Sequence, residues 1–194
     1  MSFKSVAERL FSKDKHQLES AKNASLATAD SREFPEVELF APLSGTVLEL
    51  KDVADQTFAS GALGPGVALN PVEGKLVAPA DGTVTVAFPT GHAIGLRLED
   101  GVEVLIHVGF DTVELDGKFF NPVVEKGQEV KCGDTLVEFD IAGIAEAGYP
   151  LVTPMVITNA KDLNAEIVFS PGVVSGATVN AGDALLQTSQ KISS

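Results

Sequence analysis

The sequence GVEVLIHVGFDTVEL, residues 101–115, contains the strongest strand pattern of the chain. In its first half every second residue is a β-branched apolar residue: Val102, Val104, Ile106 and Val108. A period of two is typical of a strand that has one face in a core. His107 falls on the other face, between Leu105 and Gly109, and the glycine has no side chain to cover it.

A second histidine, His92, begins another apolar run, which ends at Leu98. Residues 99–101, Glu-Asp-Gly, separate the two runs, and Asp-Gly between apolar segments is a strong hairpin signal. If Asp-Gly alone forms the turn, His92 pairs with Gly109 and lies diagonal to His107 on one face, within reach. A three-residue turn would place the histidines on opposite faces. Both faces of the first run are apolar, so alternation leaves the register open.

Two adjacent histidines admit three interpretations. A neutral imidazole can attack a phosphoryl group while its neighbour donates a hydrogen bond to the developing charge. Two imidazoles can also fill two of the four tetrahedral positions around zinc. The third interpretation is a packed, hydrogen-bonded pair without chemistry, and the spacing alone leaves all three open.

Together with PTGHA at 89–93, this stretch closely resembles the glucose-type IIA proteins of the bacterial phosphoenolpyruvate:sugar phosphotransferase system. The resemblance runs from about Leu39 to about Asn159, and HVGFDTV at 107–113 is its most specific part. Its other motifs are APLSGTV at 41–47, GPGVA at 64–68, VAPADGTV at 77–84, KGQEV at 126–130 and LVTPMVITN at 151–159.

The resemblance implies a role for each residue of the site. His107 would be the phosphorylated histidine, accepting the group from the carrier HPr and passing it to a cysteine of a sugar-specific IIB domain. The backbone carbonyl of Gly109 would hold one ring nitrogen of His107 as an N–H donor and so fix the tautomer. His92 would stabilise the phosphoryl oxygens, and Thr90 would orient the ring of His92.

The resemblance also implies partner contacts around the active histidine. An apolar docking patch would consist of Phe58, Leu63, Phe88, Leu105 and Phe110. Asp55 and Asp111 would lie at its rim and pair with arginine on HPr. No cofactor is required for the transfer, but zinc shared between His92, His107 and a partner carboxylate is expected in regulatory complexes.

Composition limits the other partners. The net charge of −13 argues against binding a nucleic-acid backbone and favours a partner with a positive surface. Cys132 is the only cysteine, so a reducing cytosol is the expected location. No apolar run approaches the ~20 residues that cross a bilayer.

Internal echoes predict the fold. APLSGTV at 41–47 resembles APADGTV at 78–84, and KGQEVKCGDTL at 126–136 resembles SGATVNAGDAL at 175–185. We therefore expect an all-β, pseudo-symmetric and flattened β-sandwich or barrel of mainly antiparallel strands over residues 38–194. At most short helical turns are expected, one of them at 142–147. The sequence shows no βαβ alternation.

The N-terminal residues differ from the rest of the chain. In residues 1–18 an apolar stripe at helical spacing consists of Phe3, Val6, Ala7, Leu10 and Phe11. Basic residues flank it: Lys4, Arg9, Lys13 and Lys15. The segment is either an amphipathic helix on the inner face of an anionic membrane or a frayed, solvated tail. Residues 19–37 form a predicted flexible linker.

Three rival functions remain open. A zinc peptidase needs a third ligand, but the residue two positions after His107 is Gly109. A biotinyl or lipoyl carrier needs a lysine at a characteristic hairpin tip, and Ala-Lys-Asp at 160–162 does not match one. A purely regulatory module would bind partners through His92 and His107 without phosphotransfer, and the intact histidine pair argues against it.

The membrane interpretation gives a direct test. If residues 1–18 bind anionic lipid, the full chain will co-sediment with anionic vesicles more strongly than a chain that lacks them. Equal co-sedimentation of the two chains would reject membrane binding through this segment.

Overall fold

The computed structural model describes residues 37–190. The predicted amphipathic segment 1–18 lies outside the described residues, as does the linker 19–37 apart from Val37, so both stay predictions. Every strand pair in the described part of the chain is antiparallel. The predicted all-β class is therefore confirmed.

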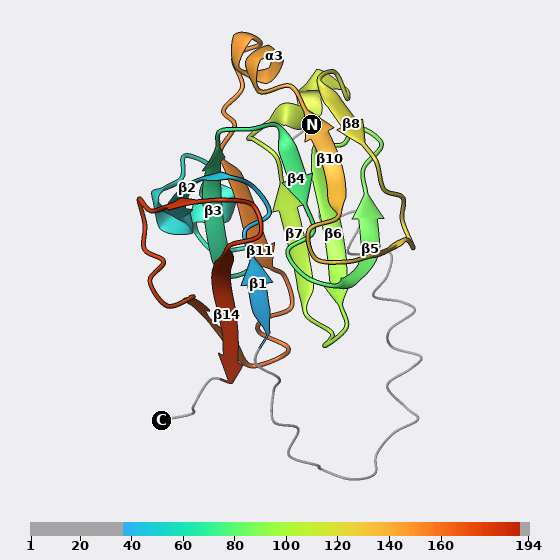
Figure 1. Cartoon of the computed structure of the whole chain (residues 1–194). Helices are drawn as coiled ribbons and strands as arrows, with labels where there is room; N and C mark the ends of the chain where they lie inside the picture. The colour runs from blue at the N-terminus through green and yellow to red at the C-terminus, as the bar shows by residue number, and fades with distance from the viewer. Residues whose placement is uncertain (1–36, 191–194) are drawn as a thin grey trace. The chain divides into compact units, whose positions relative to one another are not determined.

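One eight-stranded sheet forms the larger layer of the sandwich. Its order is β13 (Thr178–Val179), β2 (Gly45–Glu49), β3 (Gly66–Pro71), β11 (Thr153–Ile157), β7 (Glu103–His107), β6 (Ala93–Leu98), β5 (Gly82–Ala87) and β9 (Glu129–Val130). Two three-stranded sheets lie in front of it (Figure 1). They are β1 (Glu38–Phe40), β14 (Ala184–Gln190) and β12 (Ala165–Phe169), and β4 (Lys75–Val77), β10 (Thr135–Phe139) and β8 (Phe120–Pro122).

Helical structure is limited to short turns among the described residues. The predicted turn near 142–147 is confirmed as α3 (Ile141–Glu146), whereas α2 (Gln56–Ala59) was not predicted. Two 3₁₀ turns, η1 (Leu50–Asp52) and η2 (Thr112–Leu115), follow β2 and β7. No helix in residues 37–190 has the length and apolarity needed to cross a membrane.

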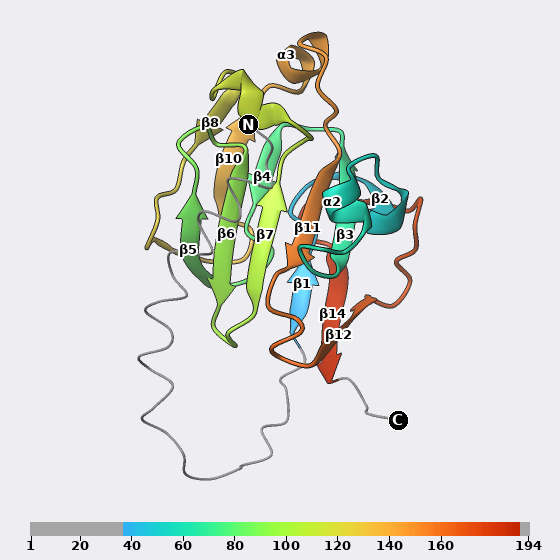
Figure 2. The ribbon, with the colours of Figure 1, turned by 180° about the vertical axis from the view of Figure 1, so that it is seen from behind.

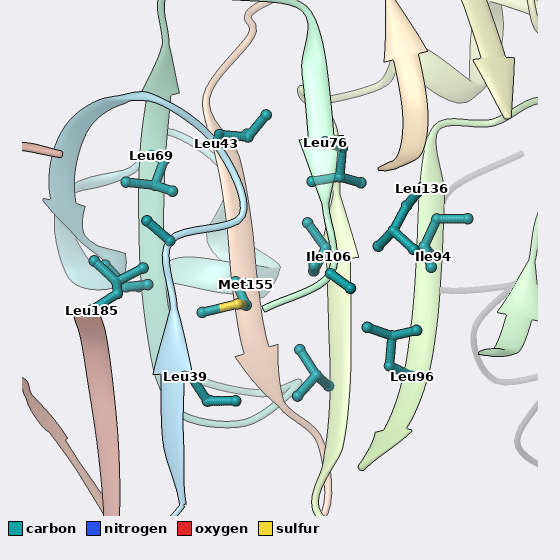
Figure 3. Close-up of a cluster of buried hydrophobic side chains, with 14 of the residues drawn as sticks. Leu39, Leu43, Leu69, Leu76, Ile94, Leu96, Ile106, Leu136, Met155 and Leu185 are labelled. Carbon is teal, nitrogen blue, oxygen red and sulfur yellow. The ribbon is translucent and has the colours of Figure 1, made fainter. Parts of the chain in front are cut away.

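Apolar side chains from both layers meet in a single core (Figure 3). From the small sheets Leu39, Leu76 and Leu136 point inward, and each is fully buried. From the large sheet Ile106 and Met155 meet them, at 0% and 1% exposure. The predicted alternation of β7 is therefore confirmed: Ile106 points into the core, and His107 points to the opposite face of the sheet.

The sequence echoes are repeated in the backbone hydrogen bonds. Ala78 N donates to Asp134 O at 2.8 Å, and at the corresponding positions Ala41 N donates to Asp183 O at 2.7 Å. The segments also bond to each other, because Phe40 N donates to the Pro79 carbonyl at 2.9 Å. The predicted pseudo-symmetry is thus present in the fold.

The two related halves of the fold, residues 41–47 with 175–185 and residues 78–84 with 126–136, make further matching hydrogen bonds.
The reciprocal bond between the segments runs from Val77 N to the Pro42 carbonyl at 2.9 Å. In both halves a side chain of the Ala-Pro segment also caps the turn of the Gly-Asp segment. Asp81 Oδ1 accepts from Cys132 N at 2.8 Å, and Ser44 Oγ accepts from Ala181 N at 3.0 Å. The two halves therefore use equivalent positions for equivalent contacts.

The hairpin of β6 and β7 closes through a three-residue loop, Glu99 to Gly101. Leu98 N donates to Val102 O at 2.9 Å, and Gly101 N donates to Leu98 O at 3.0 Å. Gly101 has φ +83°, which glycine adopts without strain. His107 consequently pairs with Ala93. The two-residue turn that would pair His92 with Gly109 does not form.

Asn159 fastens this loop from a distant part of the chain. Its Oδ1 accepts from Glu103 N at 2.9 Å, and its Nδ2 donates to Gly101 O at 2.9 Å. The neighbouring Thr158 N donates to Glu103 O at 2.9 Å. The loop that sets the register of β6 and β7 is therefore held by the residues that follow β11.

Asn159→Leu should lower the free energy of unfolding by about 2 kcal/mol, because one backbone donor and one acceptor lose their partner. Urea unfolding measures the change. The control is Asn121→Ala, whose exposed side chain donates to Glu138, and it should change stability by no more than about 0.5 kcal/mol. Similar losses in both variants would contradict the role of Asn159.

Candidate functional site

His92 and His107 lie together at the open end of the β6–β7 hairpin. Their ring centroids are 5.1 Å apart, with 66° between the ring planes. The side chains are almost fully buried, at 2% and 3% exposure. Figure 2 shows the two strands side by side in the large sheet, on the side that the small sheets leave uncovered.

The histidines meet although the loop has three residues, so the expectation that such a loop would separate them is wrong. His92 directly precedes β6, and His107 is the last residue of β7. Gly91 directly before His92 has φ +69° and Gly109 two residues after His107 has φ +74°, so the chain leaves the regular pleat at both positions. Alternation therefore no longer decides which way the side chain of His92 points.

A backbone hydrogen bond fixes the tautomer of His107. Its Nδ1 lies 2.7 Å from the carbonyl oxygen of Gly109. A carbonyl oxygen only accepts, so Nδ1 carries the ring proton and Nε2 keeps its lone pair. The structure thus brings His107 and Gly109 together in the arrangement that the resemblance implied.

Thr90 holds the ring of His92. Its Oγ1 lies 2.6 Å from Nδ1 of His92, at the turn that precedes β6. This contact leaves Nε2 of His92 as the nitrogen available to a ligand. The structure therefore brings Thr90 and His92 together, and their roles in catalysis stay predictions.

Both imidazoles are held neutral near pH 7. Burial lowers the pKa of His92 to about 3, and the neighbouring His107 acts in the same direction. Burial also lowers the pKa of His107, while the bond to Gly109 and the charges of Asp55 and Asp111 act in the opposite direction. A neutral His107 is the form that can act as a nucleophile.

Aromatic rings surround the histidine pair. The ring centroid of Phe58 lies 5.8 Å from that of His107, and that of Phe88 lies 4.9 Å from that of His92. Phe58 also contacts Phe110, and both side chains are buried, at 2% and 5% exposure. These two phenylalanines therefore pack beneath the site.

The remaining residues of the predicted patch are more accessible. Phe88, Leu63 and Leu105 are half-buried. Leu105 lies two residues before His107 on the same face of β7, and Leu63 lies in the loop after α2. Phe88 and Leu105 therefore adjoin the histidine pair at the surface.

Asp55 has a structural role that the sequence analysis missed. It is the N-cap of α2, and its Oδ1 accepts from Thr57 N at 2.7 Å and from Phe58 N at 3.1 Å. An aspartate before a helical turn is a recognised cap signal, but four residues are too few for a periodic pattern to reveal the helix. The cap places Phe58 against His107.

Asp111 directly precedes η2 and acts electrostatically on His107. It is exposed, has φ +58° and makes no side-chain cap bond to η2. Its carboxylate is therefore not used by the helix that it precedes.

The described residues hold no complete metal site. No group of three or more His, Cys, Asp or Glu residues in 37–190 converges on one position. The Nδ1 atoms of His92 and His107 are bonded to Thr90 and Gly109, so a metal would have to be bound through the Nε2 atoms. This donor set fits zinc when a partner adds the missing ligands.

The antiparallel β-sandwich and its buried, neutral histidine pair fit the class that the resemblance implied, that of small phosphotransferase components. Residues 37–163 match the family described as phosphoenolpyruvate-dependent sugar phosphotransferase system, EIIA 1, and the chain belongs to this family. It is therefore an EIIA component of the sugar phosphotransferase system, and the resemblance found in the sequence is confirmed.

Individual relatives agree with this assignment. The chain is 41% identical over 143 residues to the glucose-specific EIIA component of Staphylococcus epidermidis, covering 73% of this chain and 86% of that protein. It superposes on the glucose permease IIA from Mycoplasma capricolum with a TM-score of 0.70 at 35% identity, covering 79% of this chain and 96% of the other.

Other relatives are longer proteins. The chain is 58% identical over 124 residues to the beta-glucoside-specific EIIBCA component of Dickeya chrysanthemi, which is 64% of this chain. It spans only 20–23% of the length of this and two further EIIBCA relatives.

The low pKa of His92 gives a pH prediction. Its ring ¹⁵N shifts should stay those of a neutral imidazole between pH 8 and pH 5, whereas an unburied histidine titrates near 6.5. Below pH 6.5 the histidine binds a proton in the unfolded chain but not in the folded chain. The free energy of unfolding therefore decreases as the pH is lowered, by up to about 1.4 kcal/mol per pH unit for each such histidine. His92→Gln should reduce this slope. Titration of His92 near 6.5 would contradict the prediction.

Proposed function

We propose that His107 accepts a phosphoryl group from the phosphohistidine of HPr and passes it to a cysteine of a sugar-specific IIB domain. The observation that carries this proposal is the 2.7 Å contact of His107 Nδ1 with the Gly109 carbonyl, because it leaves the lone pair on Nε2. The family membership supports the phosphocarrier role, and relatives whose names join the B, C and A components support a IIB partner.

The transfer needs no proton to be lost from His107. The Nε2 lone pair forms a bond to phosphorus while the N–P bond of phospho-HPr breaks, and that electron pair returns to the HPr imidazole. In the second step a IIB thiolate attacks phosphorus, and the pair of the N–P bond returns to Nε2 of His107. The ring proton stays on Nδ1 throughout, facing the Gly109 carbonyl.

His92 supplies a donor for the phosphoryl oxygens. When the Thr90 hydroxyl donates to Nδ1 of His92, the ring proton of His92 sits on Nε2 and can donate to an oxygen of the phosphoryl group. A neutral donor in a buried site stabilises the charge that spreads over these oxygens in the transition state. Thr90 then sets the tautomer of His92, as Gly109 sets that of His107.

Partner binding would use the surface beside the histidines. The half-buried Phe88, Leu105 and Leu63 provide apolar contacts, and Asp55 and Asp111 provide negative charge for arginines of HPr. Phe58 and Phe110 would support this surface from below. We place the exchange in the cytoplasm, with glucose-type or β-glucoside-type sugars as the substrates that the relatives' names suggest.

A second candidate function is regulatory binding in the unphosphorylated form. Its basis is the closeness of the two imidazoles, whose ring centroids are 5.1 Å apart, so that a partner carboxylate could complete a zinc site there. If no phosphoryl adduct forms with proven donors, this function takes precedence over phosphotransfer.

Intact mass after incubation with phosphoenolpyruvate, enzyme I and HPr tests the main proposal. The wild-type chain should gain one acid-labile phosphoryl group. His107→Gln should gain none, because the nucleophile is gone. His92→Gln should still gain the group but fail to pass it to a IIB domain.

Two results would contradict these roles. A phosphoryl adduct on His107→Gln would place the acceptor at another residue. Normal onward transfer by His92→Gln would remove His92 from the transfer step.

A further inference from the structure

Backbone groups on both sides of Gly109 are bonded to three different parts of the chain. Val108 N donates to the carbonyl of His92 at 2.7 Å, and Phe110 N donates to the carbonyl of Pro150 at 3.1 Å. Between them, the Val108 carbonyl accepts from the hydroxyl of Thr112 at 2.5 Å. Three successive peptide groups after His107 thus have external partners.

Gly109 needs these restraints more than another residue would. Its φ is +74°, and glycine passes between backbone conformations with little steric cost. Rotation about its two backbone dihedrals would turn its carbonyl away from Nδ1 of His107. The Thr112 bond holds the peptide group before Gly109, and the Pro150 bond holds the peptide group after it.

Thr112 is built tightly into this position. It is the first residue of η2 and is 0% exposed. A Cβ added to Gly109 would lie 2.6 Å from Cγ2 of Thr112, so the threonine packs directly against the glycine. A buried hydroxyl that loses its acceptor is costly, which makes the bond to Val108 persistent.

We propose that Thr112 is a positioning residue for phosphoryl transfer, and that its hydroxyl keeps the Gly109 carbonyl directed at Nδ1 of His107. The bond acts through the Val108–Gly109 peptide group and maintains the tautomer with a lone pair on Nε2. This rests on the proposed function, in which Nε2 is the atom that receives the phosphoryl group. Thr112 itself touches no reacting atom.

Thr112→Ser and Thr112→Ala form the matched pair of variants, because only the serine keeps the hydroxyl. Two quantities are measured on the full chain: the ring ¹⁵N shifts of His107 and the rate of phosphoryl acceptance from phospho-HPr. Compared with wild type, Thr112→Ala should show a larger share of the His107 tautomer with the proton on Nε2, and it should accept the phosphoryl group about tenfold more slowly. Thr112→Ser should resemble wild type in both.

Thr188→Val controls for the general cost of losing a buried hydroxyl. Thr188 is also 0% exposed, and its Oγ1 accepts from Val37 N at 3.0 Å, where β14 lies beside β1. This variant should lose stability but keep the tautomer and the rate of wild type. All rates are taken at a temperature where circular dichroism shows each variant fully folded.

The outcomes separate this inference from the proposed function. A wild-type rate in Thr112→Ala, a slow rate with an unchanged His107 tautomer, or an equally slow Thr112→Ser would each overturn the role of Thr112. If wild type itself accepts no phosphate from active donors, the proposed function fails, and the tautomer comparison still decides whether Thr112 positions the Gly109 carbonyl. Should Thr112→Ala not fold, Thr112→Val provides the same loss of the hydroxyl with the packing retained.

Discussion

The antiparallel register of β6 against β7 is the constraint on which the site depends. It pairs His107 with Ala93 and leaves the backbone of His92 opposite Val108, where the two are hydrogen-bonded at 2.7 Å. A shift by one residue would send the core residues of β7 to the other face. The same strand register thus determines both the three-residue loop at one end of the hairpin and the position of the two histidines at the other end.

Burial determines the protonation state of the two histidines, and hydrogen bonding determines how their rings are held. Burial keeps both rings neutral, and it would do so in either tautomer. The Gly109 carbonyl can only accept, so it sets the tautomer of His107, whereas the Thr90 hydroxyl holds the ring of His92 and can do so as donor or acceptor. In the proposed transfer the two rings therefore need little movement, which lowers the reorganisation cost of the reaction.

Much of the fold could be predicted from local pattern, whereas the meeting of the histidines could not. The alternation in β7 and the repeated Gly-Asp turns identified strands and pseudo-symmetry correctly. In β6 both faces are covered, since Ala93, Ile94 and Leu96 are all at 0% exposure, and an apolar run of this kind carries no register. The positive φ of Gly91 and Gly109 decides where the rings point, and it could not be predicted from the sequence because glycine adopts positive and negative φ about equally easily. The resemblance supplied the assignment that spacing left open.

The pairing of β1 with β14 brings the first and last described strands together, and Val37 and Thr188 bond across 151 positions of sequence. A domain whose two ends are close together can be inserted into a longer polypeptide, or circularly permuted, without disruption of its core packing. The same sandwich is therefore suited both to a short chain and to a module within a large one, the two contexts in which its relatives occur. During synthesis this pairing can form only after β14 has left the ribosome, when nearly the whole domain is already present.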